Sequence, residues 1–162
     1  MTTEPHACVE GLPLIEPLEL RHLSEIDAIE RRSYPTPWSR AMFVSEIVKP
    51  SSICLGAVYA GRLIGYLVVS RYVDAWHVMN LAVDPDQRRR GVATRLIEEL
   101  LARTAGKEQR GYTLEVRPSN VAAVCLYERL GFFQRGIRRG YYTDNREDAL
   151  IMWRDGPGDR DY

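Results

Sequence analysis

Three consecutive arginines and a glycine lie where a hydrophobic segment gives way to a helical pattern. The stretch LAVDPDQRRRGVATRLIEELLA covers residues 81–102, with Arg88, Arg89, Arg90 and Gly91 at its centre. A helix N-terminus exposes unpaired backbone N–H groups and carries a partial positive charge. Glycine leaves room there for an anion to approach, and the arginines add charge at the rim. The junction therefore predicts an anion site, most naturally for a phosphate or pyrophosphate.

Two common phosphate motifs are absent from the chain. It contains neither GxxxxGKS or GxxxxGKT nor GxGxxG, so the junction is neither a nucleotide-hydrolase P-loop nor a dinucleotide fingerprint. A solvated run of arginines ahead of an ordinary helix is the alternative interpretation of the same residues.

A second stretch, LEVRPSNVAAVCLYERLGF at residues 114–132, places polar groups on a strand and on the helix that follows it. Strand alternation puts Glu115 on the face opposite its apolar neighbours. A carboxylate in the middle of a strand is not a usual surface residue. On the helix, Asn120 and Tyr127 are two turns apart, about 10 Å along the axis. If the strands at 76–83 and 112–117 are neighbours, one cleft opens beside both helix starts.

Each of these residues also has a purely structural explanation. Glu115 could pair with Arg117 or another surface charge, and Tyr127 could pack in the core with its hydroxyl at the rim. Asn120 could serve only as a helix-start residue. The combination with the arginine-glycine junction favours a functional site over three separate structural roles.

The hydrophobic pattern predicts an α/β (mixed α+β) domain with seven strands and four helices. A flexible arm is expected at 1–13, one domain at 14–154, and a flexible tail at 155–162. Strands are expected at 14–20, 52–60, 62–73, 76–83, 112–117, 132–140 and 147–154. Helices are expected from Ser24, which forms a weak capping box with Asp27, from Ser39, from Gly91 to about Thr104, and at 119–130.

Composition narrows the class of protein. The 162 residues are 45% hydrophobic, which suits a single globular domain, and 22 Lys+Arg balance 22 Asp+Glu. No direct nucleic-acid or membrane partner is therefore expected. Three widely spaced cysteines and three unpaired histidines predict reduced thiols and no metal site. The N-terminus lacks a basic region, so a cytoplasmic protein is expected.

The same stretches resemble a known family. Residues 81–94, LAVDPDQRRRGVAT, resemble the acyl-CoA-binding motif of the GNAT N-acetyltransferases, whose pattern Q/R-x-x-G-x-G/A is met by Arg88, Gly91 and Ala93. The stretch EVRPSNVAAVCLYERLGF resembles the strand and helix that follow in that fold. The resemblance covers residues 14–154. It implies a central, largely antiparallel sheet with flanking helices and an acyl-CoA cleft between strands 76–83 and 112–117.

The resemblance implies a role for each candidate residue. Glu115 is the expected general base and Tyr127 the general acid of acetyl transfer from acetyl-CoA, a co-substrate, with no metal. Val83 is the expected oxyanion donor, and burial is expected to raise the pKa of Glu115. The residues expected to bind the cofactor are Leu81, Ala82, Val83, Arg88, Arg89, Arg90, Gly91, Val92, Ala93, Thr94 and Asn120.

Two further stretches narrow the resemblance to the bacterial RimI type. YPTPWSRAMFVSEI at 34–47 and IRRGYYTDNREDALIM at 137–152 resemble enzymes that acetylate the N-terminal alanine of small-subunit ribosomal protein eighteen. The loop at 34–38 and the turn at 139–147 are expected to wall the acceptor entrance. Other protein N-termini, a small-molecule amine, and a non-catalytic acyl-CoA-binding role stay open as alternatives. The oligomeric state and the substrate preference beyond the first residue are left open.

Overall fold

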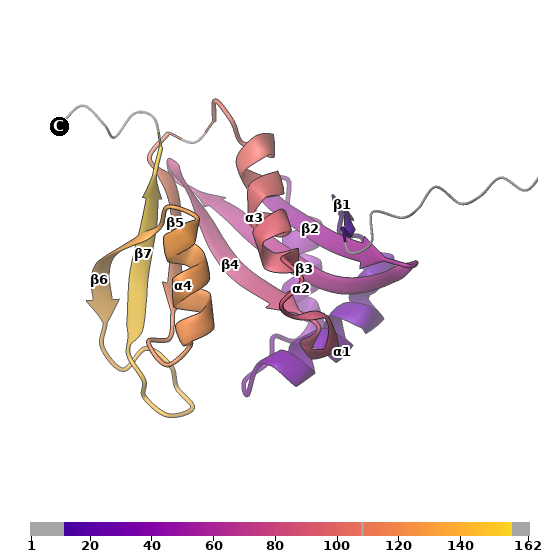
Figure 1. The fold of residues 1–162 in the computed structure, drawn as a ribbon, viewed down its shortest axis with the longest axis horizontal. Helices are drawn as coiled ribbons and strands as arrows, with labels where there is room; N and C mark the ends of the chain where they lie inside the picture. Colours follow the sequence, from indigo (N-terminus) through magenta and orange to yellow (C-terminus); the bar gives the residue numbers. More distant parts are fainter. Residues whose placement is uncertain (1–11, 108, 157–162) are drawn as a thin grey trace, which may run out of the picture.

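The structure, a computed structural model, describes residues 12–107 and 109–156. Its strands form one seven-stranded sheet in the order β1-β2-β3-β4-β5-β7-β6 (Figure 1). Neighbouring strands run antiparallel except β4 and β5, which run parallel. The strands are β1 (Leu14–Pro17), β2 (Ser52–Tyr59), β3 (Arg62–Tyr72), β4 (Ala75–Val83), β5 (Gly111–Val116), β6 (Phe133–Arg138) and β7 (Ala149–Asp155). The mixed, largely antiparallel sheet that the sequence predicts is confirmed.

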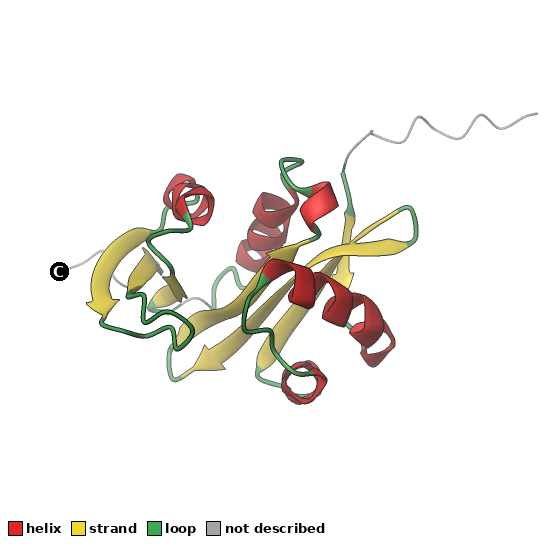
Figure 2. Ribbon diagram, turned by 90° about the horizontal axis from the view of Figure 1, so that it is seen from below, coloured by secondary structure: helices red, strands yellow, loops and turns green. Residues whose placement is uncertain are grey.

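Helices cover both faces of this sheet (Figure 2). The four α-helices of the described residues are α1 (Leu23–Ser33), α2 (Arg40–Ile47), α3 (Val92–Arg103) and α4 (Val121–Arg129). One core cluster joins α3 and α4 to the sheet through Leu96 and Tyr127. The other joins α1 and α2 to β3 through Ile26, Phe43 and Tyr66. The two sides of the sheet are therefore separately packed.

A bulge in β4 reverses the direction in which its side chains point. Val68 of β3 pairs with Asn80 and Val69 pairs with Val78, so Met79 has no partner on β3. Val78 consequently packs in the core under α3, whereas Asn80, two residues later, points to α1. A strand without a bulge would place both on the same face.

Strands β4 and β5 are paired over a very short length. Only Trp76 with Tyr112 and His77 with Thr113 face each other, although β4 continues to Val83 and β5 to Val116. The two strands separate beyond this point (Figure 1). The backbone groups at the separated ends lack the sheet partners that their neighbours have. The parallel pair thus opens at the ends that lead to α3 and α4.

A buried carboxylate fixes the segment between α1 and α2 against β4. Glu30 is only 1% exposed, and both of its oxygens lie 3.0 Å from Asn80 Nδ2. It also accepts hydrogen bonds from the Tyr66 hydroxyl and, at 3.3 Å, from the Trp38 backbone N–H. Burying a carboxylate is costly unless its lone pairs are satisfied, and here each oxygen has at least two donors.

The element boundaries differ from the sequence-based expectation at a few places. β1 ends at Pro17, and a 3₁₀ turn at Leu20–His22 precedes α1. The predicted Ser24 cap is wrong, because α1 begins at Leu23 with His22 as its N-cap, and the reciprocal capping box of Glu19 and His22 belongs to the 3₁₀ turn before it. The Ser39 cap is confirmed, since its hydroxyl accepts from the Met42 N–H.

The predicted terminal segments lie mostly outside the described residues, at 1–11 and 157–162. The expected C-terminal tail begins at Asp155, but β7 extends to this residue, which pairs with Gly111. Within the described chain, none of the helices combines the length and the apolar character needed to cross a membrane.

Candidate active site

Helix α3 begins at an open, uncapped N-terminus. Gly91 is its N-cap residue, with φ at 73° in the left-handed region, and no side chain caps the helix. A Cβ atom at Gly91 would meet no heavy atom within 4 Å. The first-turn N–H groups of Val92, Ala93 and Thr94 have no intrahelical acceptors. The structure thus gives these four residues the geometry that an anion site requires.

The three arginines before Gly91 are all exposed but differ in their contacts. Arg88 turns back on the fold, since its Nε donates to the Val83 carbonyl at 3.2 Å and one terminal nitrogen lies 3.5 Å from Ser33 Oγ. Arg89 has a positive φ of 65°. Arg88 therefore braces the junction, whereas Arg89 and Arg90 remain its exposed cations.

Sequence analysis missed the two residues that anchor this junction to α1. Asp84 is buried, caps the 3₁₀ turn at 85–87 through the Asp86 N–H, and accepts from Arg32 at 3.0 Å. The Asp-Pro pair after the strand is the local signal of such a cap. The Arg32 contact spans 52 residues and has no local signal.

The end of β4 presents alternate backbone groups to the opening beside β5. The Asp84 N–H bonds to the Ile64 carbonyl of β3, so backbone groups of Ala82 also point to β3, and those of Leu81 and Val83 point away. The Leu81 carbonyl accepts from the Tyr34 hydroxyl. The structure therefore brings Leu81 and Val83 to the opening, but not the backbone groups of Ala82.

Strand β5 carries Glu115 on the face turned away from α3 and α4. Its apolar neighbours Leu114 and Val116 pack in the core under these helices, as alternation predicts. Arg117, which the sequence analysis includes in the strand at 112–117, lies one residue past the strand end. Glu115 is held by His77 Nε2 at 2.6 Å and by Arg138 Nε at 3.6 Å.

The expected direction of the Glu115 pKa shift is wrong. Burial acts to raise its pKa, but the hydrogen bond and charge of His77, with the charge of Arg138, outweigh burial and leave the pKa below its ordinary value. Glu115 is therefore an ionised and weakly basic carboxylate at neutral pH. No sequence pattern links His77 to Glu115, because 38 residues separate them.

The two helix residues expected in the cleft have different surroundings. Asn120 is the N-cap of α4, and its Oδ1 accepts from the Ala123 N–H at 3.2 Å. Asn120 therefore has the structural role of a helix-start residue. Tyr127 is buried and packs edge-on against Phe132, with ring centroids 5.6 Å apart. Burial, followed by the nearby Tyr142, raises its pKa and keeps the phenol protonated.

Two tyrosines from distant segments lie within electrostatic range of Tyr127. Burial raises the pKa of Tyr34, and Tyr127 and Glu30 act in the same direction. Burial also raises the pKa of Tyr142 to about 12, a shift to which Glu115 contributes. Tyr142 therefore lies within electrostatic range of both proposed acid–base residues. Tyr34 and Tyr142 belong to the loop and the turn that were expected to wall the entrance.

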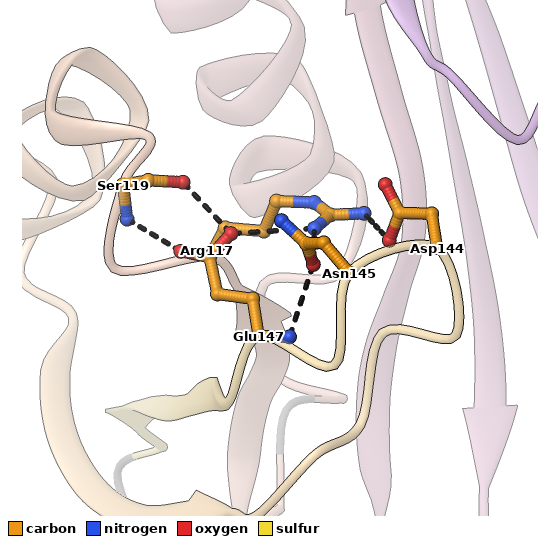
Figure 3. A network of polar contacts seen from close by, with 5 residues as sticks. All are labelled: Arg117, Ser119, Asp144, Asn145 and Glu147. Carbon is orange, nitrogen blue, oxygen red and sulfur yellow. Dashed lines mark hydrogen bonds and ion pairs between the residues drawn. The ribbon is translucent and has the colours of Figure 1, made fainter.

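The turn between β6 and β7 is fixed to the end of β5 by Arg117 (Figure 3). Its guanidinium donates to Asp144 at 2.8 Å, to Asn145 at 3.0 Å and to Glu147 at 3.3 Å. The same group lies 3.8 Å from the ring centroid of Tyr142. One side chain thus sets the position of the turn and of Tyr142.

Glu147 extends this network to the start of α4. Its carboxylate accepts hydrogen bonds from the backbone N–H and the hydroxyl of Ser119, both at 2.9 Å (Figure 3).

The described residues contain no group of three or more His, Cys, Asp or Glu side chains that could hold a metal ion. The site instead contains an anion-binding helix start, a carboxylate–imidazole pair and a protonated phenol. Together these groups suit acyl transfer to an amine.

Comparisons with known proteins agree with this geometry. Residues 23–132 match the model of the acetyltransferase (GNAT) family. The [ribosomal protein bS18]-alanine N-acetyltransferase of Escherichia coli K12 is 37% identical over 140 residues, which cover 85% of this chain and 94% of that enzyme. The N-alpha-acetyltransferase RimI of Mycobacterium tuberculosis is 38% identical over 123 residues, or 74% of this chain and 76% of the relative.

The fold is shared with a solved relative. The crystal structure of the ribosomal-protein-S18-alanine N-acetyltransferase from Escherichia coli superposes with a TM-score of 0.82 at 35% identity. The match covers 93% of this chain and 99% of the relative.

We expect Arg117→Ala to lower the thermal unfolding midpoint at pH 7 by about 2–4 °C. The hydrogen bond from Arg117 lowers the pKa of Asp144, and Ser119 together with Arg117 lowers that of Glu147. Carboxylates with a lowered pKa stabilise the fold above their unfolded pKa, and this contribution is lost as pH falls through the folded value. The difference from wild type should therefore shrink below about pH 4.

Arg139→Ala is the matched control, because Arg139 pairs with Asp148 in the same turn but its side chain is 83% exposed. This change should alter the midpoint little. Equal losses in the two variants, or a loss for Arg117→Ala that does not depend on pH, would contradict the role given to Arg117.

Proposed function

The chain belongs to the GNAT family of acetyltransferases, and from this we propose that it acetylates the N-terminal alanine of ribosomal protein bS18. The family and the RimI relatives are acetyl-CoA-dependent N-acetyltransferases. The observation that carries the acceptor proposal is 37% identity over 85% of the chain with an enzyme named for that reaction.

The open start of α3 fits the diphosphate of acetyl-CoA. This co-substrate supplies an activated acetyl thioester, and solved structures with the same fold hold acetyl-CoA or coenzyme A. We assign the diphosphate to the backbone N–H groups from Arg89 to Thr94, where Gly91 permits close approach. Arg89 and Arg90 supply the charge, and Arg88 braces the loop.

The separated edge of β4 suits the remainder of the co-substrate. Leu81 and Val83 present backbone groups that an extended chain could pair with, as an added strand would. The Val83 N–H is assigned as oxyanion donor. Ala82 contributes to co-substrate binding by holding its neighbours Leu81 and Val83 in place. Asn120 contributes by capping the start of α4.

Glu115 and Tyr127 are assigned to proton transfer. The protonated phenol of Tyr127 supplies the proton that the departing thiolate needs, and its raised pKa makes this transfer late. Glu115 lies on the acceptor side. An α-amine, with a pKa near 8, is about one tenth neutral at pH 7, whereas a lysine amine is neutral about once in two thousand. A weak base can serve an α-amine far more easily.

The proposal implies an open acceptor groove and a cytoplasmic location, where ribosomal proteins are made. The groove walls are the loop around Tyr34 and the turn around Tyr142. A protein N-terminal segment is the proposed partner, and no nucleic acid or membrane contact is required. A small-molecule amine is the second candidate acceptor, since the same acid–base groups would act on it.

We expect the protein to acetylate an alanine-starting bS18 peptide on its α-amine alone. Two matched peptides with an internal lysine, one with a blocked α-amine, would be incubated with acetyl-CoA and examined by mass spectrometry. The blocked peptide should remain unmodified, because its only amine is almost fully protonated at pH 7. Acetylation of the lysine, or of neither peptide, would overturn the proposed acceptor.

We expect Gly91→Ala to weaken acetyl-CoA binding about tenfold, which corresponds to about 1.4 kcal/mol. A methyl group there would project from the start of α3 into the space assigned to the diphosphate. Isothermal titration calorimetry would measure the affinity.

Gly106→Ala is the matched control. Gly106 also has a positive φ, 83°, and equally open surroundings, so both changes carry the same backbone strain. Equal affinities in the two variants would contradict the assignment of the diphosphate to this helix start.

We expect Tyr127→Phe to lower kcat about 100-fold while acetyl-CoA binds within about twofold of wild type. The ring would keep its contact with Phe132, and only the proton donor would be lost. Thiol release during turnover would give kcat, and calorimetry the affinity. An unchanged kcat would remove Tyr127 from the role of general acid.

A further inference from the structure

His77 and Glu115 meet across the point where β4 and β5 separate. His77 lies in the last paired position of the two strands, opposite Thr113. Its Nε2 is 2.6 Å from Oε2 of Glu115. Glu115 is the next residue of β5, after Thr113, whose side chain lies on this face. The Glu115 side chain is 13% exposed and that of His77 is 32% exposed. The pair is thus half-enclosed at the apex of the opening.

The pair faces the acceptor side of the sheet. The neighbours of His77 on β4, Trp76 and Val78, and those of Glu115 on β5 pack in the core under α3 and α4. The two polar side chains must therefore point to the opposite face. The co-substrate diphosphate is assigned to the α3 side, so an amine that approaches from the other face reaches His77 and Glu115 first.

The other charged and titratable groups around the pair can be named. Arg138 of β6 lies 3.6 Å from the second Glu115 oxygen, and Tyr142 lies within electrostatic range of Glu115. On the other side, Ser70 of β3 stands opposite His77 and accepts from Lys49 at 3.2 Å. In the described part of the chain, Nδ1 of His77 has no hydrogen-bond partner.

A carboxylate that bonds one ring nitrogen of a histidine sets the tautomer of the ring. With Glu115 ionised, Nε2 carries the proton and donates it, and the lone pair of Nδ1 is left free to accept another. The lowered pKa of Glu115 makes the carboxylate itself a poor proton acceptor. Imidazole is the side chain that most often serves as a general base in enzymes.

We infer that His77 is the group that removes the proton from the acceptor ammonium, and that Glu115 acts on the reaction by holding the His77 ring. This inference rests on the proposed acetylation of an amine and changes the residue that serves as base. Glu115 then has the role of a positioning residue, comparable to the carboxylate of a carboxylate–histidine pair in other enzymes.

The protons balance in this scheme. The ammonium ion gives its first proton to Nδ1 of His77, directly or through one water, and becomes a neutral nucleophile. As the C–N bond forms and the C–S bond breaks, Tyr127 gives a proton to sulfur. The nitrogen then returns its second proton to the Tyr127 phenolate. One proton per turnover leaves from His77 to solvent.

The tautomer of His77 can be measured on the protein alone. Long-range ¹H–¹⁵N NMR of the ring should show that neutral His77 carries its proton on Nε2, and that Glu115→Gln weakens this preference. A neutral ring protonated on Nδ1 in the wild-type protein would overturn the inference, whatever the acceptor proves to be. This readout requires neither acetyl-CoA nor a peptide.

Kinetics against pH provide the second test. At pH 7 about one tenth of an α-amine is neutral, and at pH 9 about nine tenths. A variant that lacks the base can use only the neutral fraction. For the alanine-starting peptide, kcat/KM of His77→Gln should therefore be about tenfold below wild type at pH 7 and within about twofold at pH 9.

Arg138→Gln is the matched control, because it removes the other cation beside Glu115 and leaves the imidazole in place. Its ratio to wild type should stay constant from pH 7 to pH 9. A constant deficit for His77→Gln, or no deficit, would overturn the inference. If wild type acetylates no peptide, the proposed function fails, and the tautomer measurement still decides the His77 assignment. His77→Asn serves where the glutamine variant does not fold.

Discussion

The short contact between β4 and β5 is the constraint on which the rest of the site depends. β4 is paired with β3 and β5 with β7 over nearly their full lengths, yet β4 and β5 share only two paired positions. Beyond these, the backbone groups of Leu81 and Val83 have no sheet partner. Polar backbone groups cannot be left buried and unpaired, so this edge requires side chains such as Tyr34 and Arg88, or a ligand, to pair with it.

Two polar networks hold the segments that border this opening. On one side Glu30, buried and bonded to Asn80 and Trp38, fixes the loop that carries Tyr34. On the other side Arg117 fixes the turn that carries Tyr142. Each network joins residues from separate elements through a central charged group, and losing that group would remove a hydrogen-bond partner from every other member. The two segments that border the opening are therefore preorganised.

The electrostatics of the site hold a protonated phenol and an ionised carboxylate in the same part of the structure. Burial raises the pKa of Tyr127 and keeps it a proton donor, whereas His77 and Arg138 lower the pKa of Glu115 and keep it ionised. An ionised carboxylate beside an imidazole fits orientation of that ring better than direct proton abstraction. The identity of the amine matters for the same reason, since an α-amine needs only a modest base.

The sequence by itself determined the order of strands and helices along the chain, the Ser39 cap, the open glycine at α3 and the alternation that turns Glu115 away from its apolar neighbours. These features depend on neighbours within a turn or a strand, which periodicity and capping patterns report. Only the tertiary structure decided that His77 holds Glu115, that Arg117 reaches Asp144, and that Ala82 turns its backbone to β3. The His77–Glu115 contact joins residues 38 apart, and the β4 bulge at Met79 reverses the alternation that a regular strand would have. Such contacts depend on how strands pair and separate in space, and no local pattern carries that information.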